Sequence, residues 1–291
     1  MAPDPGWRGV AGKQVLITGA TRGIGLAAAE ELARRGAKLA IVARSPERAA
    51  EAVRAIKAAA DGATVDVLEA DLHAQSSVRK LAAEALARYP KLDVLVNNAG
   101  AVYSGRELTV DGIEQTWAVN HLAPFLLTTL LEDRLKQSAP ARVITTSSDA
   151  HQGAHIPFDD LAAERSYGLQ GFERYGQTKL ANILFTTELA RRLEGTGVTA
   201  NAFHPGFVAS GFNRNNGVLM RIGMALSRPF ARSPLKGADS LVWLVDAEAA
   251  GQLDGAYVFD RRAVAPSPAA RDADAAGRLW RVSEEQTRAS A

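Results

Sequence analysis

The chain has 291 residues, of which 47% are hydrophobic and 23% charged, and its formal net charge is +2. A chain of this size and composition buries a large core, and its weak charge argues against a nucleic acid or an acidic membrane surface as partner. Cysteine is absent, which excludes disulfides, thiolate metal ligands and a cysteine nucleophile. Neither a signal-peptide pattern nor a run of about 18 apolar residues occurs, so we expect a cytoplasmic protein without an integral membrane segment.

Short apolar runs alternate with segments of helical periodicity along the chain. The expected strands are residues 14–18, 38–43, 64–69, 92–96, 142–147, 198–203 and 255–259. The expected helices are residues 25–35, 45–60, 76–89, 110–137, 175–193 and 236–246, the fourth of them bent near Pro124. This alternation predicts an α/β fold: a single doubly wound Rossmann domain, with a seven-stranded, mostly parallel sheet that helices cover on both faces.

The chain contains no internal repeat and no flexible linker, so one domain is expected, over residues 12–264. An N-terminal tail of residues 1–11 precedes it. Residues 208–235 break the alternation and are expected to form a lid over the substrate. Residues 265–291 are rich in alanine and proline and are expected to be a tail, in which residues 279–287 can form a docked helix.

Ligands of such sheets bind beyond the carboxyl ends of the strands. The first strand is followed by TGATRGIG at residues 18–25, where glycines allow backbone amides at a helix N-terminus to approach a pyrophosphate. The spacing is neither G-x-G-x-x-G nor a P-loop, and turn chemistry without a ligand is the alternative. The cofactor-binding candidates in this segment are Gly19, Thr21, Arg22, Gly23, Ile24 and Gly25.

The residue type at the end of the second strand bears on which dinucleotide binds. Folds that take NAD often carry an acid there to hold the ribose hydroxyls, but this chain has Ala43 and Arg44. Arg44, together with Arg22, suits a 2′-phosphate, because guanidinium groups bind phosphate oxygens in pairs. NADP, as NADPH, is therefore preferred, and NAD is the less favoured cofactor.

Three further strand ends carry candidate cofactor contacts. Asp71 and Leu72 follow the third strand and can touch the adenine ring. The fourth strand leads into NNAG (97–100), whose small polar residues suit a ribose, although Asn-Gly turns also occur without a ligand. The candidates there are Asn98, Ala99 and Gly100, and those after the sixth strand are Pro205, Gly206 and Val208.

Tyr175 and Lys179 lie four residues apart and so on one face of a helix. A nearby ammonium lowers the pKa of a phenol, which otherwise holds its proton to about pH 10. Such pairs also occur on solvated helices, and the surrounding motifs are what favour a site. Ser147 and Ser148 end the fifth strand, and Asn120 lies in the long helix after the fourth.

Six segments in this order resemble the short-chain dehydrogenase/reductase family over nearly the whole chain. They are TGATRGIG (18–25), NNAG (97–100), Asn120, Ser148, YGQTK (175–179) and HPGFV (204–208). The stretches VNHLAPFLLT (119–128) and SSDAH (147–151) are similar to the retinol-dehydrogenase-like branch. So is the separation of 27 residues between Ser148 and Tyr175, which is about twice that of shorter family members.

The resemblance implies a catalytic tetrad of Asn120, Ser148, Tyr175 and Lys179. Tyr175 would protonate a carbonyl oxygen while NADPH delivers hydride, and Ser148 would hydrogen-bond that oxygen. Lys179 would hold the ribose hydroxyls and favour the phenolate, and Asn120 would anchor a water on the proton path. Ser148 is chosen over Ser147 because it fits the family's serine frame and because neighbouring strand residues face opposite ways.

Other chemistries are less well supported. The five histidines form no H-E-x-x-H motif, so no metal is expected, and no G-x-S-x-G elbow indicates a serine hydrolase. A non-catalytic NADP-binding sensor or scaffold is the alternative function, against which the intact tetrad argues. Apolar residues within 208–235 suggest a medium-to-large hydrophobic carbonyl or alcohol, unless they only pack the lid. The resemblance also implies a possible homo-oligomer, a dimer or tetramer, formed through helices 110–137 and 175–193.

Overall fold

The structure is a computed structural model and describes residues 6–208 and 231–288. Eight strands are described in its central sheet, in the order β3-β2-β1-β4-β5-β6-β7-β8, and all neighbours are parallel except β7 and β8. The predicted α/β fold is confirmed, with β8 as an additional short edge strand. The strands are β1 (Gln14–Thr18), β2 (Lys38–Ala43), β3 (Val65–Glu69), β4 (Val94–Asn97), β5 (Ala141–Thr146), β6 (Val198–Phe203), β7 (Tyr257–Phe259) and β8 (Arg262–Ala263).

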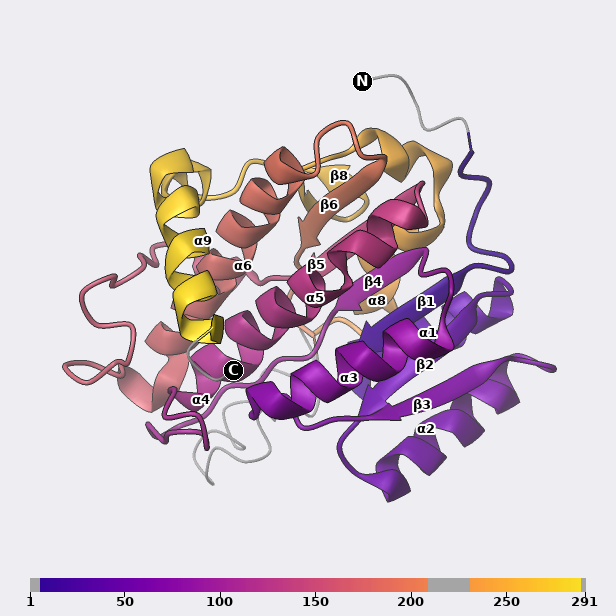
Figure 1. Cartoon of the computed structure of the whole chain (residues 1–291), viewed down its shortest axis with the longest axis horizontal. Coiled ribbons are helices and arrows are strands. Elements are labelled where there is room, and N and C mark those ends of the chain that lie inside the picture. Colours follow the sequence, from indigo (N-terminus) through magenta and orange to yellow (C-terminus); the bar gives the residue numbers. More distant parts are fainter. Residues whose placement is uncertain (1–5, 209–230, 289–291) are drawn as a thin grey trace.

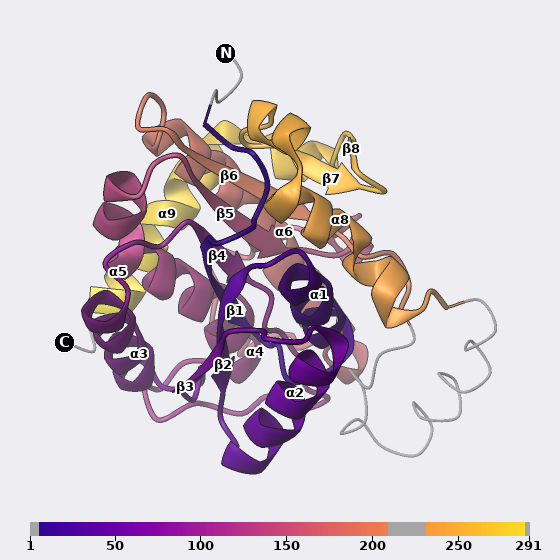
Figure 2. The same cartoon turned by 90° about the vertical axis from the view of Figure 1, so that its right-hand side faces the viewer.

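Helices cover both faces of this sheet (Figure 1), and Figure 2 shows the two helical layers on either side of the strands. The strand order reverses between β1 and β4, and in such folds ligands bind at the carboxyl ends of the strands beside this reversal. One face carries α1 (Gly23–Arg34), α2 (Pro46–Ala59) and α8 (Pro234–Asp246); the other carries α3 (Gln75–Arg88), α5 (Ala123–Gln137) and α6 (Phe172–Arg192).

Strand β1 shows why successive residues in the middle of a central strand are apolar. Leu16 packs into the core on one face of the sheet, whereas Val15 and Ile17 pack into the core on the other. Alternate side chains of a strand point to opposite faces, and here helices cover both. Each fully buried side chain of this size contributes about 1.5–3 kcal/mol to folding.

The helix expected over residues 110–137 begins later and is not regular. It consists of α4 (Gln115–Trp117), a π-helical turn η1 (Ala118–Leu122) and α5. Pro124 has no N–H, so it cannot make the α-helical bond to the carbonyl of Asn120, and a wider turn forms instead. Asn120 therefore lies in the irregular turn of this helix.

Both ends of the described chain pack more closely than the expected tails. Trp7 and Val10 are buried, and the indole of Trp7 donates to the carbonyl of Asp246 at 3.2 Å. At the other end α9 (Ala273–Arg288) lies along α6, and the ring of Trp280 is 5.0 Å from that of Phe125 (Figure 1). The docked helix expected over residues 279–287 is thus longer than predicted and begins at Ala273, whereas the packing of the N-terminal segment was not predicted.

The expected lid is only partly covered by the described residues. Of residues 208–235, those at 209–230 lie outside the described part of the chain, and Val208 pairs with Arg232 in a parallel bridge. Among the described helices, none is both long enough and apolar enough to cross a membrane. In residues 6–208 and 231–288, no cluster of three or more His, Asp or Glu side chains could hold a metal ion.

Candidate active site

A cavity of about 1160 Å³ lies at the carboxyl ends of the strands and brings the sequence motifs together. Its described walls include every predicted site residue except Thr21, Gly23 and Asn120. The predicted residues that line it are Gly19, Arg22, Ile24, Gly25, Arg44, Asp71, Leu72, Asn98, Ala99, Gly100, Ser148, Tyr175, Lys179, Pro205, Gly206 and Val208.

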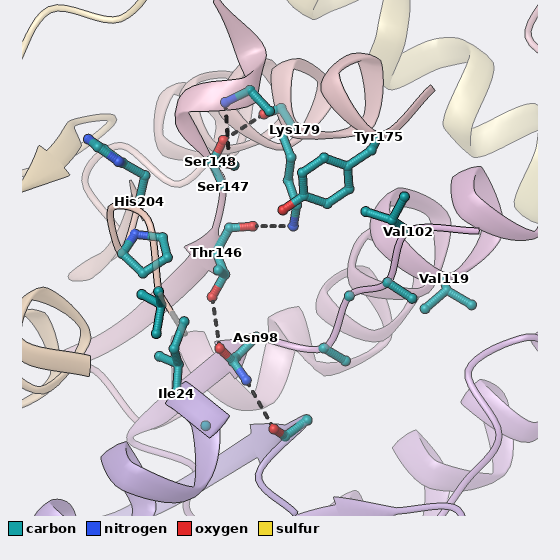
Figure 3. Close-up of a pocket in the computed structure, with 18 of the residues that line it drawn as sticks. Ile24, Asn98, Val102, Val119, Thr146, Ser147, Ser148, Tyr175, Lys179 and His204 are labelled. Carbon is teal, nitrogen blue, oxygen red and sulfur yellow. Dashed lines mark hydrogen bonds between the residues drawn. The ribbon is translucent and has the colours of Figure 1, made fainter. Parts of the chain in front are cut away.

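Tyr175 and Lys179 both extend from α6 into this space, next to Thr146 (Figure 3). Burial raises the pKa of Tyr175 to about 12, and the hydroxyl of Ser148, which is hydrogen-bonded to the phenol, acts to lower it. Burial also lowers the pKa of Lys179 to about 7. Without a cofactor the expected effect of the ammonium on the phenol is thus outweighed, because a low-dielectric site disfavours the charged form of both groups.

Lys179 is fixed by the strand beneath it. Its Nζ donates to the carbonyl of Thr146 at 3.0 Å and lies 5.4 Å from the centre of the Tyr175 ring. The side chain is only 2% exposed, so burial and a single carbonyl define its position. Because its pKa is about 7, the Lys179 amine can exist in both protonation states near neutral pH.

The two serines that directly follow β5 both line the cavity, but their hydroxyls make different contacts. Ser147 donates its hydroxyl to the backbone carbonyl of Lys179 at 2.7 Å. Ser148 turns instead toward Tyr175, and its Oγ accepts from the N–H of Ala150 at 3.2 Å. Ser148 is thus the serine that can reach a reacting oxygen beside the phenol.

Asn120 does not line the cavity and is fully buried. Its Oδ1 accepts from the N–H of Ala101 at 2.8 Å. Its Nδ2 donates to the carbonyl of Ala101 at 2.8 Å and to Oγ1 of Thr178 at 3.1 Å. The side chain therefore ties the segment after NNAG to α6, and the water expected at Asn120 stays a prediction.

A line of hydrogen bonds joins the lysine to the glycine turn, through two threonines that the sequence analysis did not single out. Thr146 donates to Oδ1 of Asn98 at 3.2 Å, and Nδ2 of Asn98 donates to the carbonyl of Gly19 at 3.2 Å (Figure 3). Oγ1 of Thr18 accepts from the N–H groups of Asn98 and Ala99, both at 3.0 Å. In the sequence, the one feature that pointed to these threonines is that each is the last residue of its strand, β1 or β5.

The glycine turn fits the pyrophosphate of a dinucleotide. Gly19 has φ +69°, and a Cβ on Gly25 would lie 2.2 Å from the carbonyl oxygen of Gly19. Only glycines allow this close packing of the turn onto the start of α1. The first turn of α1 contains no acidic side chain, so its N-terminus favours an anion.

The end of the cavity around Arg44 carries a small polar cluster. Nη1 of Arg44 lies 3.7 Å from Oδ1 of Asp71 and 3.4 Å from Nδ1 of His73. Nε2 of His73 contacts the phenol oxygen of Tyr103 at 2.7 Å. The side chain of Arg44 is 63% exposed, which leaves it accessible to a phosphate. His73 and Tyr103 were not predicted, because neither belongs to a recognisable motif.

Apolar side chains dominate the other end of the cavity. Val102 and Val119 lie across the space from His204 (Figure 3), whose ring stacks on Phe259 at 4.1 Å. Phe172 lines the wall on the α6 side. The apolar residues that the sequence analysis placed in the lid between positions 209 and 230 lie outside the described part of the chain.

Residues 13–218 match the family model described as short chain dehydrogenase. Over 276 residues the chain is 45% identical to Retinol dehydrogenase 12 of Mus musculus, which covers 95% of this chain and 86% of that protein. It is 42% identical over 275 residues to a protein of Streptomyces sp. (strain C5), proposed to be a daunorubicin C-13 ketoreductase, with 94% and 92% of the two chains covered.

Solved structures resemble the chain along its length. A Mycobacterium paratuberculosis protein matches with a TM-score of 0.78 and 34% identity, over 98% of this chain and 97% of that one. A short chain dehydrogenase from Burkholderia cenocepacia J2315, in complex with NADP, matches with a TM-score of 0.69 and 28% identity, over 86% and 96% of the two chains. Fold and sequence similarity therefore point to the same family.

Proposed function

We propose a specific reaction for this chain, which belongs to the short-chain dehydrogenase family and is an oxidoreductase acting on CH–OH groups. It interconverts a medium-to-large hydrophobic ketone or aldehyde with its alcohol, uses NADP(H), and employs Tyr175 as the acid–base group. One observation carries the proposal: Tyr175, Lys179 and Ser148 line one cavity, in which Nζ of Lys179 lies 5.4 Å from the centre of the Tyr175 ring.

In the reductive direction Tyr175 donates its phenolic proton to the carbonyl oxygen as that oxygen gains charge. Ser148 donates a hydrogen bond to the same oxygen. Lys179 can then return a proton to the Tyr175 phenolate, because burial lowers the pKa of the lysine to about 7. Asn120 holds Ala101 and Thr178 in place around the lysine. When bound, the nicotinamide cofactor supplies or accepts the hydride.

The preference for NADP(H) is supported by two arginines at the adenine end of the cavity, Arg22 and Arg44. Guanidinium groups suit the doubly charged 2′-phosphate that distinguishes NADP from NAD. The glycine turn and Asn98 would hold the pyrophosphate and the neighbouring ribose. The carboxylate of Asp71 faces Arg44 at 3.7 Å and leaves part of that guanidinium open to solvent.

The substrate class is supported by the volume and apolar lining of the cavity at its Val102 and Phe172 end. A screen of NADPH oxidation with nonanal, acetophenone, menadione and a ketosteroid tests this assignment, with NADH run in parallel. Turnover should rise with the apolar size of the carbonyl compound. A clear preference for small polar carbonyls, or tighter binding of NADH than of NADPH, would contradict the assignment.

Substitution of Tyr175→Phe tests the acid–base role directly. Loss of general acid catalysis lowers turnover by about 10²–10⁴-fold, because the carbonyl oxygen then lacks its proton donor. NADPH binding, measured by fluorescence titration, should change little, since only the hydroxyl is removed. Substantial remaining activity in the Phe variant would falsify the mechanism.

A further inference from the structure

His151, in the SSDAH stretch, has a structural environment that the proposed reaction does not yet use. Its ring is fully buried and contacts the protein through both nitrogens. Nδ1 lies 2.8 Å from the backbone carbonyl oxygen of Ser148, and Nε2 lies 3.1 Å from the backbone nitrogen of Ser267. The imidazole thus joins the end of β5 to the segment that leads into α9.

These partners define the tautomer of the ring. A carbonyl oxygen only accepts hydrogen bonds, so Nδ1 must carry a hydrogen to bond Ser148. A backbone N–H only donates, so Nε2 must present its lone pair to Ser267. His151 is therefore a neutral imidazole protonated on Nδ1. The phenol oxygen of Tyr257, 3.4 Å from Nδ1, faces the same N–H.

The carbonyl that His151 holds belongs to the serine of the active site. The backbone N–H of His151 also donates to that carbonyl, at 3.2 Å, while Oγ of Ser148 accepts from Ala150 at 3.2 Å. Residues 148–151 thus form a tight turn (η2, Asp149–His151) closed by bonds to both polar groups of the serine. Rotation of the Ser148 peptide would break all of them.

The turn η2 packs closely against α6, the helix that carries Tyr175. A Cβ on Gly176 would lie 2.6 Å from the carbonyl oxygen of Ala150, so the backbones of η2 and α6 are nearly in contact. Gly176 directly follows Tyr175. The position of the turn therefore sets how the hydroxyl of Ser148 meets the phenol of Tyr175.

We propose that His151 is a positioning residue, whose neutral imidazole fixes Ser148 for its contact with Tyr175 while its other nitrogen binds the backbone N–H of Ser267. The proposal rests on the proposed function, because it assumes that Ser148 acts on the substrate oxygen.

Two substitutions of similar size separate the two contacts of the ring. His151→Asn places an amide N–H at the position of Nδ1 and keeps the bond to Ser148, but it loses the acceptor for Ser267. His151→Gln places an amide oxygen at the position of Nε2 and keeps the bond to Ser267, but it loses the donor to Ser148. The probe reaction is reduction of p-nitrobenzaldehyde by NADPH, with p-nitrobenzyl alcohol and NADP⁺ for the reverse direction.

We expect the Asn variant to keep kcat within about threefold of the unsubstituted protein, and the Gln variant to lose about ten- to a hundredfold, because small misplacements of a catalytic group have effects of this size. The KM for NADPH and the melting temperature should be alike in the two variants. Equal losses in both variants would show that the bond to Ser148 is not what matters.

A pH profile supplies a readout that a merely structural role would not move. The Ser148 hydroxyl lowers the pKa of Tyr175, so a displaced serine should shift the rising limb of alcohol oxidation to higher pH in the Gln variant. In the described part of the chain, the titratable groups near the phenol include Lys179 on α6 and Tyr257 on β7, and both are unchanged in these variants. An unshifted limb would overturn the proposal.

Combination with Ser148→Ala distinguishes this proposal from the proposed function. If Ser148→Ala leaves turnover intact, the assigned role of the serine fails. If it slows turnover, then adding His151→Gln should change kcat by less than about twofold, because the two groups act as one unit. An additive loss would overturn the positioning role.

One measurement does not depend on turnover. Isotope-labelled histidine and a long-range proton–nitrogen correlation spectrum, assigned with His151→Asn, should show a His151 ring protonated on Nδ1 only at neutral pH. A ring protonated on Nε2, or on both nitrogens, contradicts the geometry on which the proposal stands.

Discussion

At the scale of single residues, the surroundings of a side chain decide its charge as much as its type does. Lys179 and Arg44 are both basic and line the same cavity. Lys179 is buried, which lowers its pKa to about 7, whereas the side chain of Arg44 is 63% exposed. The first can exchange a proton near neutral pH, and the second offers a permanent charge for binding an anion.

Arg44→Ala should therefore affect one cofactor and not the other. Loss of a charge-assisted hydrogen bond to a phosphate costs about 1.5–3 kcal/mol, so the KM for NADPH should rise by about ten- to a hundredfold. The KM for NADH should change by less than about threefold in the same reaction. Steady-state kinetics with both cofactors measure the effect.

Arg54→Ala provides the matched control, because Arg54 is an exposed arginine on α2 and does not line the cavity. It should leave both KM values unchanged. If Arg44→Ala weakened NADH and NADPH equally, Arg44 would not be reading the 2′-phosphate.

At the scale of elements, a buried ion pair connects the helix that carries Asn120 to the helix that carries Tyr175. Nε of Arg174 donates to Oε2 of Glu114 at 2.8 Å, and both side chains are at most 1% exposed. The carboxylate of Glu114 also caps α4, accepting from the N–H of Trp117 at 2.9 Å. The pair fixes the start of α6 relative to α4, and thus helps to keep Tyr175 beside the segment that Asn120 holds.

Arg174→Met should lower the free energy of unfolding by about 3–5 kcal/mol, because it leaves the carboxylate of Glu114 buried without its partner. Adding Glu114→Gln to that variant should cost much less than Glu114→Gln does alone, since the two residues act on each other. Urea unfolding of the single and double variants measures this coupling.

An exposed ion pair gives the comparison. Arg165→Met removes a guanidinium that contacts Asp159 on the surface, and it should leave the midpoint of unfolding unchanged. Strictly additive losses at Glu114 and Arg174 would mean that the buried pair does not act as a unit.

At the scale of the whole molecule, the C-terminal helix α9 packs alongside α6 (Figure 1), and its Trp280 reaches Phe125 of α5. Trp280 packs against the rings of Phe125 and Phe185, and Nε2 of His121 contacts Oγ of Ser283 at 2.8 Å. The sequence analysis assigned homo-oligomer contacts to α5 and α6. That assembly stays a prediction. Because α9 packs on α6, a partner subunit that bound there would also contact the outer face of α9.

Trp280→Ala should destabilise the protein by about 3–5 kcal/mol, because it opens a cavity where α9 meets α5 and α6. Arg281→Ala, at an exposed position of the same helix, should change stability by less than about 0.5 kcal/mol. Thermal and urea unfolding of the two variants test this, and similar effects in both would indicate that α9 is not part of the core.

The sequence by itself determined the order of strands and helices, the glycine turn and the residues at the strand ends. These features depend on local periodicity and on residue types that few other conformations accept. It also favoured Ser148 over Ser147, because Ser148 fits the frame in which the resembling family carries its serine. Val102 and Val119, on the cavity wall, carried no such local signal.

Only the tertiary structure decided how these residues act on one another. The pKa values of Tyr175 and Lys179 depend on burial, which segments distant in the sequence create. The side chain of Asn120 is hydrogen-bonded to the backbone of Ala101. This contact forms because Asn120 lies in a widened helical turn before Pro124 and because the segment after β4 folds back onto that turn. The contact of His151 with Ser267 spans 116 residues. No local pattern encodes such a contact, because its partners meet only when the whole chain has packed.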